Sequence, residues 1–288
     1  MNASSDLFPG KHFISTVLAA LDTKTEMSGA LARVYLMRSA MAGGIIGVMY
    51  LTFYAVVDAF ATAGGASLVA IGRIVGAVIF GFALVFIYYS KSELLTSNMM
   101  IVTIGAYYRR VSAGRSLRIL AMCFLGNIIG GAVVALLVWG SSVADGNIGA
   151  LMNASVDHKL EFITEGASGW LDLFIRAVLC NFMINLAMLL VYNGLIKDDL
   201  TKSLVMIMSV FIFAFVGFEH SVANTVLFTI VGLHDGIDVG LAAANIGMVL
   251  LGNFVGGGLL IGWYYAYAND DRRHVLRSRR GASEHPGA

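Results

Sequence analysis

The stretch GFEHSVANTV (residues 217–226) places Glu219 directly before His220, with Asn224 shortly after and long apolar runs on both sides. A polar or charged side chain that leaves water without gaining a partner is costly. The chain must therefore supply partners for these side chains inside an apolar environment. How it does so decides the architecture of the molecule.

The composition indicates a membrane protein. Hydrophobic residues make up 58% of the 288-residue chain and charged residues only 13%, whereas about a quarter of a soluble domain is charged. Glycine is abundant (33 residues) and proline rare (2 residues), as expected for closely packed membrane helices. The net charge of +1 gives no indication of a nucleic-acid partner. Cys123 and Cys180 lie inside apolar runs, so we interpret both as core residues and predict no disulfide, metal site or cofactor.

Six long apolar segments approach the roughly 20 residues that cross a bilayer. The N-terminal run FISTVLAAL (13–21) is short and lacks a basic n-region, so it is interpreted as an amphipathic surface helix that begins after Pro9 and Gly10. We predict an N-terminal cytoplasmic segment (1–35), a six-span transmembrane domain (36–268) and a basic cytoplasmic tail (269–288). The predicted spans are 36–60, 67–89 with a continuation at 97–108, 117–141, 171–195, 203–233 and 241–268.

Basic residues divide the connections between the spans into two classes. They gather before the first span, between the second and third, between the fourth and fifth, and after the sixth. The other connections carry a single lysine, Lys159. An even number of spans then places both termini on the cytoplasmic side of the plasma (inner) membrane. The basic residues are Lys11, Lys24, Arg33, Arg38, Arg109, Arg110, Arg115, Arg118, Lys197, Lys202, Arg272, Arg273, Arg277, Arg279 and Arg280.

Two sequence patterns recur at an offset of 126 residues. ELLTSN (93–98) matches EHSVAN (219–224) in its first and last residues, and GNIIGG (126–131) matches GNFVGG (252–257). Two matches at one offset indicate an internal repeat, and three spans in each half give the halves opposite orientation. We interpret the glycines as helix-packing positions and the asparagines as interhelical hydrogen-bond donors. The paired polar positions are Glu93 and Glu219, Asn98 and Asn224, and Asn127 and Asn253.

The segments 88–98 and 217–226 are predicted to interrupt the second and fifth spans. Non-helical backbone at membrane depth is tolerated only inside protein or beside a cavity, and inverted repeats usually place a transport site at such breaks. Glu219 is interpreted as a structural residue whose carboxylate holds loop N–H groups and a helix N-terminus. His220 is interpreted as functional, because imidazole donates, accepts and carries a proton near neutral pH, as an anion pathway requires.

GFEHSVAN, ELLTSN and GNFVGGGLLIGWYY (252–265) resemble the signatures of the formate/nitrite transporter family. The resemblance covers about residues 35–268. It implies an all-α homopentamer in the lipid bilayer, with aquaporin-like protomers and one pore through each protomer. It also implies an extended loop that interrupts the second span and a shorter one that interrupts the fifth.

The resemblance implies four polar residues along the substrate pathway. His220 matches the central pore histidine, and Thr96 matches the threonine that hydrogen-bonds it. Asn181 matches an asparagine near that pair. Lys159 matches a lysine of the outer vestibule, where it would raise the local anion concentration; without the resemblance it would be interpreted as a solvated loop lysine.

The resemblance also implies two constrictions, although aromatic side chains at helical spacing are more often core residues. Many formate channels have Asp and Phe where this chain has Glu93 and Leu95, so a narrow specificity for formate is not implied. The implied constriction residues are Phe80 and Phe213 on the outer side and Leu84 and Leu94 on the inner side.

A small anion cannot cross a dry apolar constriction, whereas its neutral acid can. Desolvation raises the proton affinity of the anion, so we expect protonation inside the pore or proton coupling at His220. The expected substrates are formate and other short monocarboxylates such as lactate and acetate, with nitrite or hydrosulfide as alternatives.

Two other classes fit the sequence less well. An intramembrane enzyme is disfavoured because adjacent Glu219 and His220 do not face each other and no G-x-S-x-G or H-E-x-x-H pattern is present. An aquaporin would need paired Asn-Pro-Ala boxes, but Pro9 and Pro286 both lie outside the predicted spans.

Overall fold

The structure, a computed structural model, describes residues 7–272, which form helices and no strand. Six helical segments in this part are long and apolar enough to cross a membrane, which confirms the predicted number of spans. Most of the predicted basic tail, residues 273–288, lies outside the described residues. The spanning segments are α3 (Ala32–Gly64), α4 (Ala66–Tyr89), α6 (Ala113–Trp139), α8 (Ala167–Tyr192), α9 (Asp199–Val216) and the continuous run of α11 (Val239–Asn253), η1 (Phe254–Trp263) and α12 (Tyr264–Ala268).

Two spans are broken, as predicted. Helix α4 is followed by α5 (Leu95–Tyr107), and α9 is followed by α10 (Ser221–His234). The breaks are shorter than the polar segments 88–98 and 217–226, because Thr96, Asn98 and Asn224 already lie in the helices that follow. Short breaks leave few backbone groups without helical partners, which limits the cost of placing them at membrane depth.

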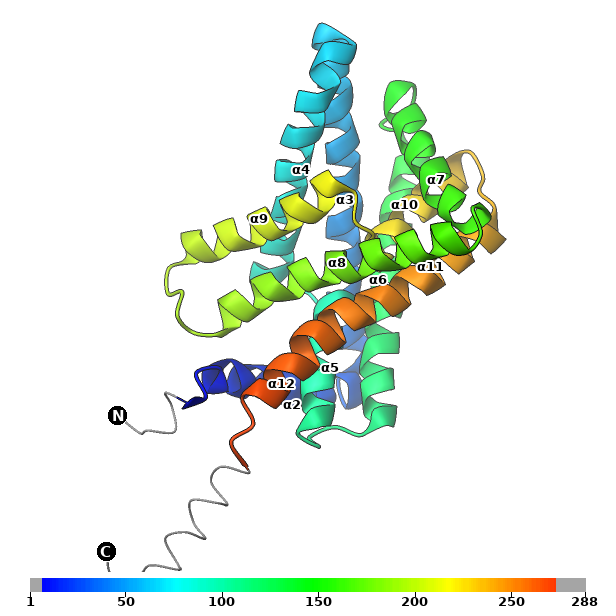
Figure 1. The fold of residues 1–288 in the computed structure, drawn as a ribbon. Coiled ribbons are helices and arrows are strands. Elements are labelled where there is room, and N and C mark those ends of the chain that lie inside the picture. The colour runs from blue at the N-terminus through cyan, green and yellow to red at the C-terminus, as the bar shows by residue number, and fades with distance from the viewer. Residues whose placement is uncertain (1–6, 273–288) are drawn as a thin grey trace, which may run out of the picture.

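Helix α2 (Lys11–Gly29) begins directly after Gly10, as predicted, and buries Phe13, Val17 and Leu21 completely. Figure 1 shows α2 at one end of the molecule and α7 (Asn147–Thr164) at the opposite end. Helix α7 was not predicted, and the region before the fourth span was expected to be a connection. Since α7 precedes α8 as α2 precedes α3, each half of the repeat begins with its own short helix.

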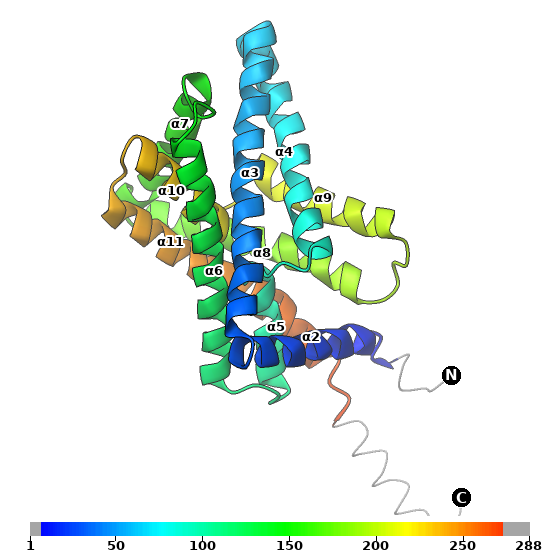
Figure 2. The same ribbon diagram turned by 180° about the vertical axis from the view of Figure 1, so that it is seen from behind.

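The two halves interlock around the broken spans. Helix α5 packs against η1, whereas α10 packs against α6, so each half-helix contacts the last span of the opposite half. Helices α3, α4 and α6 run side by side in both views, and the α3–α4 hairpin protrudes beyond the other helices (Figures 1 and 2). This arrangement brings both breaks into the interior of the described protomer.

The repeated glycines pack helices closely, as predicted. A Cβ atom added at Gly130 would lie 1.7 Å from the backbone oxygen of Ala40 in α3. A Cβ added at Gly256 would lie 2.0 Å from the backbone oxygen of Val178 in α8. Neither distance is compatible with a side chain, so only glycine permits this approach of the backbones. The π-helical geometry of η1 around Gly256 was not predicted from the sequence.

Candidate transport pathway

The first break is held by an asparagine of the third span. The Asn127 side chain donates to the backbone oxygens of Glu93 and Ser39, both at 2.8 Å, and accepts from the backbone N–H of Leu95 at 3.1 Å. One amide thus satisfies backbone groups on both sides of the break. The backbone N–H of Glu93 donates to the Arg38 oxygen at 3.1 Å.

The second break repeats this arrangement. Asn253 donates to the backbone oxygens of Glu219 at 2.9 Å and Ala177 at 2.8 Å, and accepts from the N–H of Ser221 at 2.9 Å. Asn127 and Asn253 are therefore interhelical donors, as predicted. They also supply hydrogen-bond partners for the broken backbone, a role that was not predicted.

The glutamates bind side chains, and the prediction that Glu219 holds backbone N–H groups at the helix N-terminus is wrong. Lys159 Nζ lies 2.7 and 2.8 Å from the two Glu219 carboxylate oxygens, and Asn224 donates to Glu219 at 2.6 Å. In the first half, Glu93 accepts from Lys24 Nζ and from Asn98 at 3.1 Å. Opposite charges and amide donors compensate the burial of both carboxylates.

Lys159 is neither in a loop nor solvated. It belongs to α7, and its side chain is only 10% exposed beside a Glu219 side chain that is 4% exposed. It lines the cavity on the α7 side, as expected for a vestibule lysine, but its charge is paired with Glu219. Lys24 of α2 forms the corresponding pair in the first half. It was not a predicted site residue, because its role becomes visible only when α2 and α7 are seen to occupy corresponding places in the two halves.

His220 and Thr96 meet across the two breaks, as predicted. The distance between Thr96 Oγ1 and His220 Nε2 is 3.2 Å, and both residues are buried. His220 Nδ1 accepts the backbone N–H of Ala223 at 3.2 Å, which makes His220 the N-cap of α10. Because Nδ1 accepts, the neutral ring carries its proton on Nε2 and donates it to Thr96.

Asn181 of α8 lies next to this pair. Its amide donates to the backbone oxygens of Thr96 at 3.1 Å and Asn253 at 2.7 Å. Asn185, one turn later, also donates to the Thr96 oxygen at 3.2 Å and to Asn181 Oδ1 at 2.7 Å. Asn185 was not predicted as a site residue, although its spacing from Asn181 places both on one helix face. Together they fix Thr96 to the second half.

Three cavities follow one another through the protomer. The middle chamber has a volume of about 20 Å³, and His220 is the one ionisable residue among the described residues that line it. This volume admits about one water-sized molecule. Neither Thr96 nor Asn181 belongs to its described lining. The chamber is therefore narrow and lined by apolar residues, except at His220.

The predicted constriction residues lie at the two boundaries of this chamber. Leu84 and Leu94 line both the chamber and a vestibule of about 270 Å³ on the side of α2. Phe80 and Phe213 line both the chamber and a vestibule of about 170 Å³ on the side of α7. The two phenylalanine rings pack edge to face, with centroids 6.2 Å apart, and Phe213 stacks on His220 at 5.9 Å.

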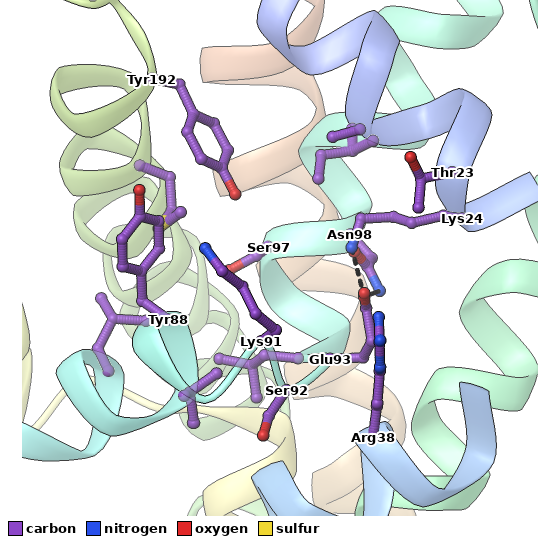
Figure 3. A pocket seen from close by; sticks show the side chains of 16 residues that line it. Thr23, Lys24, Arg38, Tyr88, Lys91, Ser92, Glu93, Ser97, Asn98 and Tyr192 are labelled. Atoms are coloured by element: carbon purple, nitrogen blue, oxygen red, sulfur yellow. Dashed lines mark hydrogen bonds and ion pairs between the residues drawn. The ribbon is translucent and has the colours of Figure 1, made fainter. Parts of the chain in front are cut away.

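The two vestibules are polar. The α7-side vestibule contains the Lys159–Glu219 pair together with His158 and Arg176. The α2-side vestibule is shown in Figure 3, where a dashed line marks the Asn98–Glu93 contact among the labelled side chains. A solute that crosses the protomer by this route leaves one polar cavity, passes a narrow apolar chamber and enters a second polar cavity.

Comparison with known proteins gives matches over most of the chain. A family profile described as formate/nitrite transporter matches residues 11–267. A transporter of Bacillus subtilis (strain 168), YwcJ, is 31% identical over 200 residues, which cover 68% of this chain and 75% of the relative. The nitrite transporter NirC of Salmonella typhimurium is 30% identical over 236 residues (80% and 81% covered), and the formate channel FocA of Haemophilus influenzae is 28% identical over 220 residues (68% and 74%).

Solved structures give the same picture of the fold. An FNT family ion channel superimposes with a TM-score of 0.78 at 25% identity, covering 90% of this chain and 99% of the other. A pentameric formate channel with formate bound superimposes with a TM-score of 0.65 at 22% identity, covering 82% and 96% of the two chains.

Proposed function

Because this chain belongs to the formate/nitrite transporter family and is a channel for small anions, we propose that it conducts formate and other short monocarboxylates through one pore in each protomer. Nitrite and hydrosulfide remain alternative substrates within the family. The observation that carries the proposal is the series of three cavities, in which His220 supplies the ionisable group of an otherwise narrow and apolar chamber.

The chamber favours passage of the neutral acid. An anion that leaves either vestibule loses water in an apolar space, and this loss raises its proton affinity. His220 presents an imidazole at this point, with its ring held by Thr96 Oγ1 on one nitrogen and the Ala223 N–H on the other. We propose that the substrate meets His220 here, while Thr96 and Asn181 hold the ring and the break in position.

Lys159 has a smaller electrostatic role in this proposal than a free lysine would have. It lines the α7-side vestibule but forms an ion pair with Glu219. A paired cation presents a dipole to solution, and the field of a dipole decreases faster with distance than that of a charge. We therefore propose that Lys159 mainly stabilises the second break, through Glu219, and attracts anions only weakly.

The further elements of the proposal are a plasma (inner) membrane location, cytoplasmic termini and a homopentamer. The basic residues of the alternate connections support the orientation, so the α2 side is the cytoplasmic side. The superposition on a pentameric channel supports the fold of one protomer. We propose no enzymatic activity: Glu219 binds Lys159 whereas His220 binds Thr96, so the two adjacent residues do not form a catalytic pair.

The proposal is tested by reconstituting the purified protein in vesicles and measuring the flux of formate, acetate, lactate, nitrite and hydrosulfide together with the internal pH. We expect pH-linked flux of short monocarboxylates in the wild type and its loss in His220→Phe, with the oligomer intact by size-exclusion chromatography. His234→Phe changes a histidine that lines neither the chamber nor a vestibule, and it should conduct normally. Undiminished flux in His220→Phe would contradict a central role of this residue.

A further inference from the structure

Lys91 adopts a backbone conformation that normally favours glycine. Its φ angle is 56°, in the left-handed region. Helix α4 ends in a turn in which the N–H of Lys91 donates to the Tyr88 oxygen at 3.2 Å and that of Ser92 donates to the Ile87 oxygen at 3.0 Å. This is a Schellman motif, whose left-handed position is usually occupied by glycine.

The second half of the repeat provides an internal comparison. Gly217 lies 126 residues after Lys91, at the end of α9, and has a φ angle of 81°. The N–H of Phe218 donates to the Phe213 oxygen at 2.9 Å, as that of Ser92 does to Ile87. The same turn therefore carries glycine in one half and lysine in the other. The lysine places a charged side chain at a position where the other half of the repeat has none.

The Lys91 side chain lies in the α2-side vestibule. Its Nζ atom is 5.0 Å from the centroid of the Tyr88 ring. Figure 3 shows the amine directed into the space between Tyr88 and Tyr192, near Ser97. These three hydroxyl-bearing residues line the same cavity as Lys91. A cation and several hydroxyl groups thus converge on one space.

The charges of the α2-side vestibule do not cancel. Lys24 is paired with Glu93, whereas Lys91 and Arg38 have no carboxylate partner within residues 7–272. Arg38 Nη1 contacts the Met27 sulfur at 3.4 Å. These two side chains leave an excess of positive charge in a cavity of about 270 Å³.

The α7-side vestibule lacks this excess. The backbone oxygen of Arg176 accepts the N–H of Glu219, as the backbone oxygen of Arg38 accepts that of Glu93. The Arg176 side chain donates to Asp172 at 3.0 Å and to the Gly217 oxygen at 3.0 Å. Lys159 is paired with Glu219. The cations of the α7-side vestibule are paired, whereas the α2-side vestibule has the additional Lys91. The two ends of the pathway therefore differ electrostatically, although the backbone repeats.

We propose that the α2-side vestibule is a binding site for a short monocarboxylate anion, with Lys91 as the residue that holds the carboxylate and Arg38 as a second source of positive potential. The cavity is large enough to hold the anion together with water, so binding there does not require the desolvation that the middle chamber imposes. The tyrosine and serine hydroxyl groups supply neutral hydrogen bonds. This site rests on the proposed function and makes substrate capture stronger from the α2 side.

The experiment measures anion binding and flux in parallel. Binding of ¹³C-labelled acetate to the purified protein is followed by NMR line broadening, and acetate flux is measured from the α2 side of vesicles of defined orientation. The variants are Lys91→Gln, Lys91→Arg and Lys91→Gly. The matched control is Lys197→Gln, which removes an exposed lysine outside this cavity.

We expect Lys91→Gln to raise the half-saturating acetate concentration roughly two- to fivefold, as for an ion pair that stays partly hydrated. Lys91→Arg and Lys197→Gln should saturate like the wild type. Lys91→Gly should bind acetate as weakly as Lys91→Gln but melt at a higher temperature than the wild type, because it relieves the left-handed backbone.

An unchanged half-saturating acetate concentration in Lys91→Gln would overturn the site. An equal increase in Lys197→Gln would also overturn it, because it would show only an effect of diffuse surface charge. The NMR measurement separates this result from a failure of the proposed function. If the wild type carries no anion flux, the transport proposal fails, whereas weaker acetate binding in Lys91→Gln alone would still support the vestibule site.

Discussion

At the scale of single residues, Glu93, Glu219 and His220 at the breaks each have definite partners. His220 has Ala223 on one ring nitrogen and Thr96 on the other, so a single tautomer satisfies both contacts. This arrangement orients the ring toward the chamber without an ionised partner in direct contact. A neutral imidazole in a fixed orientation fits a pathway in which the substrate itself changes protonation state.

The Thr96 hydroxyl should therefore matter for transport. We expect Thr96→Ala to reduce flux and shift its pH profile, because loss of the acceptor leaves the buried Nε2–H group unpaired at a cost of about 1–3 kcal/mol. Thr96→Ser keeps the hydroxyl and should retain most of the flux. Proteoliposome assays over a range of pH make the comparison. Identical flux profiles in Thr96→Ala and the wild type would reduce Thr96 to a packing residue.

The Lys159–Glu219 pair should act on stability. Lys159→Met leaves a buried carboxylate without its cation and is expected to destabilise the protein by about 3 kcal/mol. Adding Glu219→Gln should recover much of this loss, because no uncompensated charge then remains. Lys202→Met, which breaks a surface pair with Asp199, should cost much less, because surface ion pairs contribute little to stability. Thermal or denaturant unfolding in detergent provides the measurement, and equal losses in both lysine variants would disprove the distinction.

At the scale of elements, the long helices approach one another through glycine and the broken helices are held by asparagine. Both devices repeat in the two halves, with Asn127 and Asn253 in equivalent contacts. Without a hydrophobic driving force between helices in lipid, close packing and buried hydrogen bonds provide the association. The breaks can therefore stay open at membrane depth because neighbouring spans supply their partners.

Gly130 offers a test of this packing. Gly130→Ala is expected to destabilise the protein by about 1–3 kcal/mol, since the new methyl group meets the Ala40 carbonyl and overpacks the α3–α6 contact. Gly247→Ala in α11 is the matched control, because nothing lies within 4 Å of its added Cβ. That change should be neutral or slightly stabilising through helix propensity. Similar melting temperatures for both variants would argue against backbone contact as the reason for Gly130.

At the scale of the whole molecule, the proposed pathway lies inside one protomer. Both breaks, both constrictions and all three cavities are built from a single chain. The interlocking of α5 with η1 and of α10 with α6 is what closes them around a common interior. In the proposed homopentamer each chain therefore carries its own complete pore.

Mixed oligomers distinguish protomer pores from a shared axial pore. When wild-type and His220→Phe chains are co-expressed in known ratios, independent pores should give a flux proportional to the wild-type fraction. A single pore shared by the assembly would instead make the flux fall with about the fifth power of that fraction, because one altered chain would affect every subunit. Reconstituted mixtures, quantified by mass spectrometry, decide between the two curves.

The sequence by itself determined the features that depend on local pattern. Hydropathy set the six spans, the 126-residue offset revealed the repeat, and the polar residues at Glu93 and Glu219 located both breaks. The same offset aligns Lys91 with Gly217, and this alignment could have indicated the left-handed backbone of Lys91. These signals lie along the chain, because span length, spacing and residue type require no knowledge of which helices are neighbours.

Only the tertiary structure decided which groups meet. Lys159 pairs with Glu219 across 60 positions of sequence, His220 rather than Glu219 caps α10, and Asn181 holds the backbone of Thr96. The helical form of α7 and the π-helical η1 were also not predictable from hydropathy. The physical reason is that a buried polar group is satisfied by whichever partner the packed helices bring within about 3 Å, and that choice depends on how the two halves interlock.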